Sequence, residues 1–333
     1  YAFSNCTSLT DVTIPDSVTS IGGGAFIGCT SLTEIIVDSN NKSYTSKDGI
    51  LFDKSLKTII CYPGGKAGNF IIPDSVTSIG YRAFEYCKKL TSVIIPDSVI
   101  SIGDFTFDGC TSLTNITISD SVTSIGYEAF RWCTSLTEII VDSNNKSYTT
   151  ENGVLFDKNL ETIICCPGGK SGNFTIPDGV TSIADSAFEG CESLTSVIIP
   201  DSVTSIGDFA FYECTSLADV TIPDSVTSIG SYAFYECTSL TDVTIPDSVT
   251  SIGDETFEFC VSLTDVTIPD SVTNIGDYAF EYCENLTTIT IPDSVMSIGD
   301  YAFYSCDNLT DIYYSGAESK WNEISIGDSA IPS

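Results

Sequence analysis

The stretch SYAFYECTSLTDVTIPDSVTSIG, residues 231–253, is followed at once by a close copy, DETFEFCVSLTDVTIPDSVTNIG, residues 254–276. A cysteine stands at the same place in each copy. Cysteines at this place occur at positions 6, 29, 87, 110, 133, 191, 214, 237, 260, 283 and 306. Eight of the ten intervals are 23 residues and two are 58, so one register runs along the chain with two insertions of 35 residues. Such repetition predicts one array of stacked units in place of closed globular domains.

Each 23-residue unit predicts one β-containing coil. In LTDVTIP the apolar residues Val243 and Ile245 alternate with polar ones, which is the pattern of a half-buried strand. Pro246 ends this strand because it has no amide hydrogen for a ladder. The next residues, DSVTSIG, turn and extend again, and we expect YAFYEC to form a short helical or 3₁₀ segment. One coil alone has too small a core to fold, so we expect each coil to be stabilised by its neighbours.

The repeat resembles a known family. The spacing of Leu240, Val243 and Ile245 has the form L-x-x-L-x-L, which is the strand signature of leucine-rich repeats. With IPDSVTSIG and AFxxC, which recur along essentially the whole chain, the unit resembles the BspA-like leucine-rich repeat family (LRR_5 type) of bacterial surface proteins. The fold class we predict is a leucine-rich repeat solenoid. It is a right-handed superhelix of 23-residue coils with parallel strands on the concave face.

The domain organisation follows from the register. We assign residues 1–306 to the repeat array and residues 307–333 to a C-terminal capping segment. The two insertions, about 38–69 and 142–173, copy each other. In the capping segment, Trp321 and Ile324 on a short helix in AESKWNEI would cover the exposed end of the core. Tyr1 begins inside a repeat, so we expect the sequence to be part of a longer protein, with any signal or anchor outside it.

Composition restricts the partners. Apolar residues make up 42% of the chain and charged residues 17%, which is typical of a folded protein. The chain has 45 acidic and 13 basic residues, and a net charge of -32 argues against binding to nucleic acid or to anionic lipid. No stretch approaches the roughly 18 apolar residues of a membrane span, so we expect no membrane insertion of this sequence.

The residues that usually carry chemistry are scarce. Histidine is absent and no C-x-x-C pair occurs, so we predict buried core thiols, no metal site and no cofactor. The aspartates after each proline, such as Asp247, predict turn residues, although a stacked row of carboxylates is also compatible with Ca²⁺. No nucleophile and base pair is evident, and acidic pairs recur on every coil, whereas an active site should break the symmetry. We therefore predict no catalytic residues and no enzyme activity.

Two sets of residues are candidates for binding a partner. The outward strand positions would line the concave face with acidic and hydroxyl groups; they include Asp219, Thr221, Asp242, Thr244, Asp265 and Thr267. A solvated sheet face without a ligand is the alternative. Aromatic surface candidates are Trp132, Tyr212, Tyr235, Phe259 and Tyr304, although such rings more often stack on the neighbouring coil. The insertions add polar loops with several lysines, and loops on a rigid scaffold are also binding candidates.

The resemblance implies a function that the residues alone do not. It implies a secreted or surface-displayed scaffold for protein interaction or adhesion, located outside the cell or on its surface. The partner would be a protein, including a host or extracellular-matrix protein, and a glycan is also compatible. One alternative is a structural spacer that holds other domains off the cell surface. Another is a carbohydrate-binding or carbohydrate-active solenoid, which would need one asymmetric acidic cleft.

Overall fold

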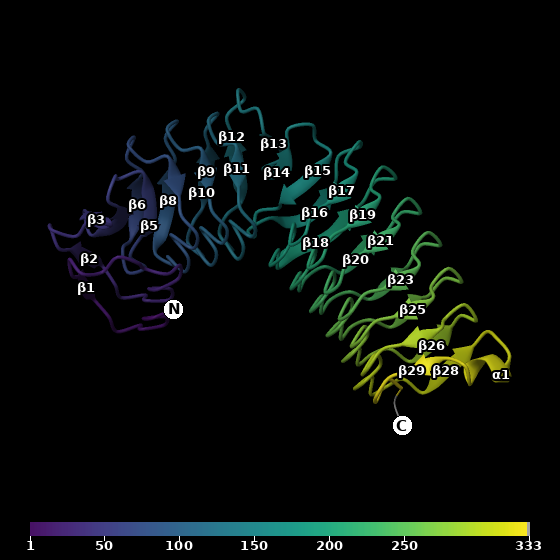
Figure 1. Cartoon of the computed structure of the whole chain (residues 1–333). Coiled ribbons are helices and arrows are strands. Elements are labelled where there is room, and N and C mark those ends of the chain that lie inside the picture. The colour runs from purple at the N-terminus through teal and green to yellow at the C-terminus, as the bar shows by residue number, and fades with distance from the viewer. Residues whose placement is uncertain (332–333) are drawn as a thin grey trace. The chain divides into compact units, whose positions relative to one another are not determined.

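Most coils contribute one longer strand and one strand of two residues, and equivalent strands of many successive coils pair in parallel (Figure 1). The structure is a computed structural model that describes residues 1–331. Val197 pairs with Val220 and Ile206 pairs with Ile229, so the register of pairing equals the 23-residue period of the sequence. The predicted solenoid of stacked, parallel coils is confirmed.

The chain divides into two compact units. Unit 1 contains residues 1–159 and 167–169, and unit 2 contains residues 160–166 and the chain from residue 170 onward. The longer strands of unit 1 are β1 (Asp11–Ile14), β2 (Glu34–Val37), β6 (Gly68–Ile71), β8 (Leu90–Ile94), β10 (Asn115–Ile118) and β12 (Glu138–Val141). Its short strands are β7 (Ser78–Ile79), β9 (Ser101–Ile102) and β11 (Ser124–Ile125).

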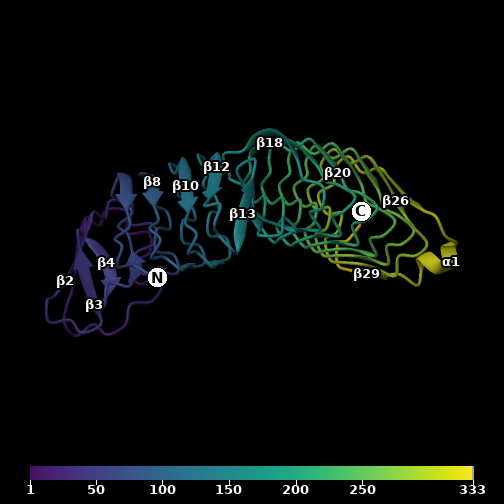
Figure 2. The ribbon, with the colours of Figure 1, turned by 90° about the horizontal axis from the view of Figure 1, so that it is seen from above.

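Unit 2 repeats the same pair of strands, and Figure 2 shows its coils one behind another. Its longer strands are β16 (Ser171–Thr175), β18 (Ser193–Ile198), β20 (Asp219–Thr221), β22 (Asp242–Thr244), β24 (Asp265–Thr267), β26 (Thr288–Ile291) and β28 (Asp311–Tyr314). Its short strands are β17 (Ser182–Ile183), β19 (Ser205–Ile206), β21 (Ser228–Ile229), β23 (Ser251–Ile252), β25 (Asn274–Ile275), β27 (Ser297–Ile298) and β29 (Ser325–Ile326).

The insertions form β-hairpins that join the same architecture. In the first insertion β3 (Tyr44–Lys47) pairs antiparallel with β4 (Ile50–Asp53), and β5 (Thr58–Cys61) then pairs in parallel with β7. The second insertion has the matching hairpin of β13 (Tyr148–Glu151) and β14 (Val154–Asp157), followed by β15 (Thr162–Cys165), which pairs in parallel with β17. After each insertion the pairing follows the 23-residue period, since Ile79 pairs with Ile102 and Ile183 pairs with Ile206.

The core is a set of columns, each built from one residue type of the repeat. The phenylalanines of AFxxC are buried and stack ring on ring, with centroids 5.1 Å apart for Phe211 and Phe234 and 5.4 Å apart for Phe234 and Phe257. The thiols form a second column, in which Cys237 Sγ donates to the carbonyl oxygen of Phe211 at 3.2 Å. All 14 cysteines are free, and in the column only Cys6 is exposed. The prediction of packing thiols is confirmed.

The AFxxC segments differ from the prediction of a short helical or 3₁₀ segment, because they form consecutive turns. Tyr232 and Glu236 have φ values of 59° and 54°, and a left-handed residue at every fourth position prevents a helix from continuing. Alternate amides also leave the segment: Phe234 N–H donates to Thr256 O of the next coil, whereas Tyr235 N–H closes a local turn on Tyr232 O. A helix would need all of these donors for itself.

A column of aspartates on the side of the short strands links neighbouring coils by hydrogen bonds. Asp208 Oδ1 accepts the N–H of Ser231 at 2.8 Å, and Asp277 Oδ1 accepts the N–H of Asp300 at 2.8 Å. The preceding glycine of each coil is required for this contact, since a Cβ at Gly230 would lie 2.4 Å from the backbone nitrogen of Asp208. The aspartates of the IGD sequences that each accept a backbone N–H from the next coil in this way are Asp104, Asp208, Asp254, Asp277 and Asp300.

The C-terminal segment contains the predicted helix, α1 (Glu318–Trp321). The Trp321 ring meets the ring of Tyr314 in β28 edge to face, with centroids 5.3 Å apart, and both Trp321 and Ile324 are half-buried. The assignment of residues 1–306 to the array and of 307–333 to a cap stays a prediction, and its last two residues lie outside the described chain. Within residues 1–331 no helix has the length and apolar composition that a membrane crossing requires.

Candidate binding surfaces

The strand face of unit 2 presents the predicted candidates to solvent. Along β20, β22 and β24 the aspartate and threonine of each DVT triplet are exposed and the valine between them is buried. Asp242 lies beside Asp265 and Thr244 lies beside Thr267 in the paired strands. The structure thus brings these residues together in two straight rows, and their role in binding stays a prediction.

The equivalent strand positions of unit 1 have other residues, and the sequence pattern did not single out the isoleucines among them. The first row reads Asn69, Ser92, Asn115, Glu138 and the second reads Ile71, Ile94, Thr117, Ile140. The signal was available, because IIPDS replaces TIPDS at 71–75 and 94–98, and again at 198–202 in unit 2. The strand face is therefore acidic and hydroxyl-rich along β20, β22 and β24, whereas it is largely neutral and partly apolar along β6, β8 and β10, and β18 also presents an exposed isoleucine, Ile198.

The aromatic candidates mostly contact one another. Tyr212 stacks on Tyr235 at 4.7 Å between ring centroids, and Phe259 stacks on Tyr282 at 4.5 Å. These rings are half-buried, while Tyr304 is 44% exposed. Burial raises the pKa of Tyr235, and the nearby Glu258 carboxylate adds to the effect. The rings thus stack on rings of the neighbouring coil, which is the alternative to partner binding given in the sequence analysis.

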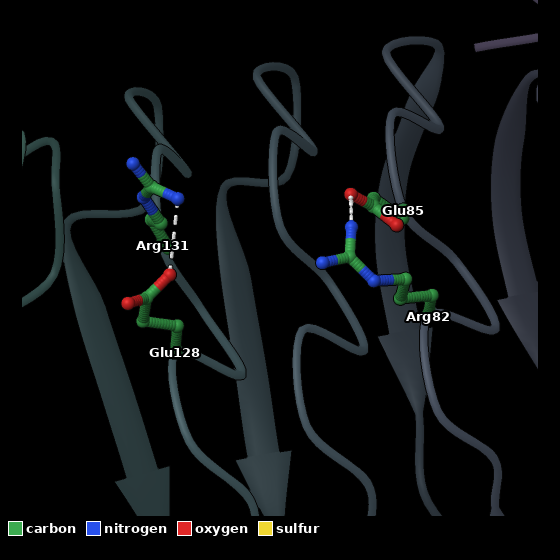
Figure 3. Close-up of polar contacts among 4 residues, drawn as sticks. All are labelled: Arg82, Glu85, Glu128 and Arg131. Atoms are coloured by element: carbon green, nitrogen blue, oxygen red, sulfur yellow. Dashed lines mark hydrogen bonds and ion pairs between the residues drawn. The ribbon is translucent and has the colours of Figure 1, made fainter. Parts of the chain in front are cut away.

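Trp132 has a different neighbour. The Arg131 guanidinium carbon lies 3.9 Å from the centre of the Trp132 ring, close enough for a cation–π contact. Arg131 also pairs with Glu128 three residues earlier, with 3.0 Å between Nη1 and Oε2 (Figure 3). Trp132 is half-buried, and its ring packs against the Arg131 guanidinium.

A mirrored ion pair lies two coils earlier in the same turn column. Arg82 pairs with Glu85 through Nη1 and Oε1, and its guanidinium carbon lies 4.2 Å from the centre of the Phe105 ring (Figure 3). These are the two arginines of the sequence. Asp108 occupies the turn column between Glu85 and Arg131, and it is 2% exposed. The register predicts this cluster once the units are aligned, since positions 85, 108 and 131 are 23 residues apart.

Burial sets the protonation of the acids in this cluster. It raises the pKa of Asp108 to about 7, and the Arg131 guanidinium offsets only part of that effect. Burial also raises the pKa of Glu85, and the Arg82 guanidinium offsets part of that increase. The cluster combines two guanidinium groups with three carboxyl groups, of which Asp108 is partly protonated near neutral pH, so its net charge is small. We expect it to stabilise the turns of unit 1 and to offer little net charge to a ligand.

Unit 2 has a purely acidic counterpart. Glu258 and Glu281 are buried at equivalent turn positions of neighbouring coils, and Tyr232 donates its hydroxyl hydrogen to Glu255 Oε1 at 2.6 Å. Burial, together with the adjacent carboxyls of Glu255 and Glu281, raises the pKa of Glu258 to about 9. In residues 1–331 no group of three cysteine, aspartate or glutamate side chains is arranged to hold a metal ion.

A buried asparagine side chain holds each insertion loop. Asn41 is fully buried, and its Nδ2 donates to Pro15 O at 2.8 Å and to Val18 O at 2.9 Å, while Asn145 makes the same two bonds in the second insertion. Lys66 Nζ donates to Asp48 O at 2.9 Å. Each asparagine side chain thus links its insertion to the backbone of the preceding coil, and Lys66 is bound to the first hairpin.

The family model of the BspA type leucine-rich repeat region matches the chain in six copies, over residues 1–67, 54–171, 165–281 and 227–330. The comparison with curated proteins gave no match. Among solved structures, a leucine-rich cell surface protein from Faecalibacterium prausnitzii is 33% identical, with a TM-score of 0.63, over 95% of this chain and 82% of its own.

Two further solved structures are similar. A leucine-rich repeat protein from Eubacterium ventriosum is 25% identical, with a TM-score of 0.53, over 83% of this chain and 95% of its own. The pneumococcal vaccine antigen PcpA is 20% identical, with a TM-score of 0.55, over 93% of this chain and 69% of its own, which is a likeness of fold alone.

Proposed function

Because the chain belongs to the BspA type leucine-rich repeat family, we propose that it is a non-enzymatic scaffold that binds a protein partner outside a bacterial cell or on its surface. The partner class is a protein exposed to the same space, which includes host and extracellular-matrix proteins. Adhesion is the biological role that this class of contact would serve. The protein that is 33% identical to this chain is described as a cell surface protein, which supports the location.

One observation carries this proposal: the buried positions of the strands hardly vary, while the exposed positions do. The inward residue is Val93, Ile116, Val197 or Val220, all at most 5% exposed. The outward residue in front of these four is Ser92, Asn115, Ser196 and Asp219, respectively. A scaffold that needs only stability has no physical reason to vary its outward face, whereas a binding surface requires local differences.

The experiment is a binding screen with the purified chain. It should be immobilised and exposed to purified extracellular-matrix proteins by biolayer interferometry, and in parallel to a glycan array. Saturable binding to at least one protein, weakened by salt because the chain carries a charge of -32, is the expected result. Silence against every protein would refute the adhesion role, and selective glycan binding would favour the carbohydrate-binding alternative.

The spacer alternative has its own support in unit 2. The outward residues Asp242 and Thr244 are repeated unchanged as Asp265 and Thr267 on the next coil, so this part of the strand face shows no local specialisation. Deleting residues 231–253 removes one whole period and preserves the register. If unit 2 is a spacer, this deletion keeps the fold by circular dichroism and leaves any binding by the chain unchanged. A loss of binding would assign the partner to unit 2.

A further inference from the structure

The strand face of unit 1 carries a row of three exposed isoleucines and one threonine. In the sheet of β6, β8, β10 and β12, Ile71 pairs with Ile94, Ile94 with Thr117, and Thr117 with Ile140. Ile71 is 67% exposed, Ile94 is 55% exposed and Ile140 is 42% exposed. Neighbouring strands lie ~4.8 Å apart, so the row spans roughly 15 Å of sheet. We call Ile71, Ile94, Thr117 and Ile140 the isoleucine row.

The neighbourhood of the row is neutral over most of its length. Asn69, Ser92 and Asn115 stand two residues earlier on β6, β8 and β10, and only β12 adds a carboxylate, Glu138. In unit 2, β20, β22 and β24 have aspartates beside threonines at the equivalent places, whereas β18 has Ser196 beside Ile198, which is 55% exposed. The isoleucine row differs from β18 in that two of its exposed isoleucines, Ile71 and Ile94, are paired neighbours.

Strand propensity alone does not account for the isoleucines. Isoleucine and threonine are both β-branched and both suit a strand, and threonine occupies the same row at Thr117 and in unit 2. Single exposed apolar side chains are normal on a protein surface, but adjacent ones on paired strands form a contiguous apolar patch. Burial of such a patch against a partner is favourable, because it removes apolar surface from water.

We propose that the isoleucine row is the contact centre for a protein partner whose surface has apolar side chains in the middle and cationic side chains around them. This inference rests on the proposed function and specifies its site. The apolar centre would match the isoleucines, and the basic rim would face Glu138 and the negative field of the chain. A second copy of this chain fits poorly, because two partners of charge -32 repel one another. A sugar fits poorly as well, since the row has no aromatic ring for stacking.

The central test compares the native chain with a triple variant, Ile71→Thr, Ile94→Thr and Ile140→Thr. Threonine keeps the β-branch and removes apolar surface, so circular dichroism and the urea unfolding midpoint should change little. A phage-displayed random dodecapeptide library is selected against the native chain and counter-selected against the triple variant. We expect peptides enriched in apolar residues together with Lys and Arg, which bind the triple variant at least about tenfold more weakly.

A triple Ile→Val variant at the same positions is the matched control, because it keeps the row apolar and should retain most of the binding. The inference is wrong if no recovered peptide distinguishes the native chain from the threonine variant, or if the valine variant loses binding equally. It is also wrong if sedimentation finds a dimer that the threonine variant abolishes, since a second copy would then cover the row.

The binding screen with matrix proteins separates this inference from the proposed function. A matrix protein that binds the native chain and the threonine variant equally well would leave the function standing and overturn the isoleucine row as its site. Row-dependent peptides combined with silence from every matrix protein would support the row and refute the adhesion role. Loss of a matrix protein's binding in the threonine variant would support both.

Discussion

Three glycines of one repeat column should respond very differently to the same substitution. A Cβ at Gly230 would lie 2.4 Å from the nitrogen and 2.5 Å from Oδ1 of Asp208. At Gly253 the nearest atom would be Ser231 Oγ at 3.1 Å, and at Gly22 no atom lies within 4 Å. Ordinary van der Waals contacts of a Cβ begin near 3.4 Å, so Gly230→Ala overlaps its neighbour by about 1 Å.

Relief of this overlap must separate two coils. That movement lengthens the bond from Ser231 N–H to Asp208 Oδ1, now 2.8 Å, and the bond from Gly230 N–H to Ile206 O, now 3.0 Å. Each lost hydrogen bond costs about 1 kcal/mol, and overpacking adds ~1–3 kcal/mol, so we expect Gly230→Ala to lower the free energy of unfolding by ~3–5 kcal/mol. Gly22→Ala should be neutral or stabilise by up to ~1 kcal/mol, because alanine restricts the unfolded chain.

The assay is urea unfolding of the three alanine variants, followed by far-ultraviolet circular dichroism at one pH and ionic strength. The expected order of stability is Gly22→Ala highest, Gly253→Ala intermediate and Gly230→Ala lowest. Amide hydrogen exchange provides a local check, since the N–H of Ser231 should lose protection only in the Gly230 variant. Equal unfolding midpoints for Gly22→Ala and Gly230→Ala would refute the idea that the glycine column exists to let the coils approach.

Three further perturbations test other parts of the fold. Phe234→Ala removes a fully buried ring between two stacked neighbours and should destabilise unit 2 by ~3–5 kcal/mol in the same urea assay, whereas Tyr304→Ala, at a 44% exposed ring, should cost under ~1 kcal/mol. Because the pKa of Glu258 is raised to about 9 from 4.5, the folded chain holds a proton that the unfolded chain releases; stability should fall as pH rises from about 5 to 9, and Glu258→Gln should flatten this slope. Cys6 is exposed and should react with a disulfide reagent within seconds, Cys61 and Cys165 are partly exposed, and the eleven buried thiols should react only after unfolding; rapid labelling of a variant that lacks Cys6, Cys61 and Cys165 would contradict the packed thiol column.

The sequence predicted those features that one unit contains in itself. The alternation around Val243 and the stop at Pro246 are local, so the strand could be read from a single copy, and the constant cysteine interval then gave the stacking register. The burial of Cys237 followed because eleven equivalent thiols need one equivalent environment. What was wrong was the helical or 3₁₀ form of AFxxC, since Phe234 donates its N–H to a carbonyl 22 residues later, a partner that no local propensity describes.

Features that depend on a difference between units were harder to predict than features that all units share. The ion pairs of Arg82 and Arg131 lie outside the consensus, and their relation to Asp108 appears only when three coils are placed on one another. The isoleucine row has the same origin, because each of its residues is unremarkable within its own unit. An alignment of the repeats against each other, read column by column, contains this information without any coordinates.

The repeat therefore separates stability from recognition in physical terms. Inward columns of Phe, Leu, Val and Cys must match the residue above and below, so a change at Phe234 disturbs Phe211 and Phe257 at once. Outward residues such as Ile94 pair with neighbours on the sheet, yet their side chains meet mainly water, and Ile94 can sit between Ile71 and Thr117 without strain on the core. A new surface can thus be built from several coils by substitutions that each cost little stability. Stable variants that differ only in binding are the consequence that the threonine variants of the isoleucine row would reveal.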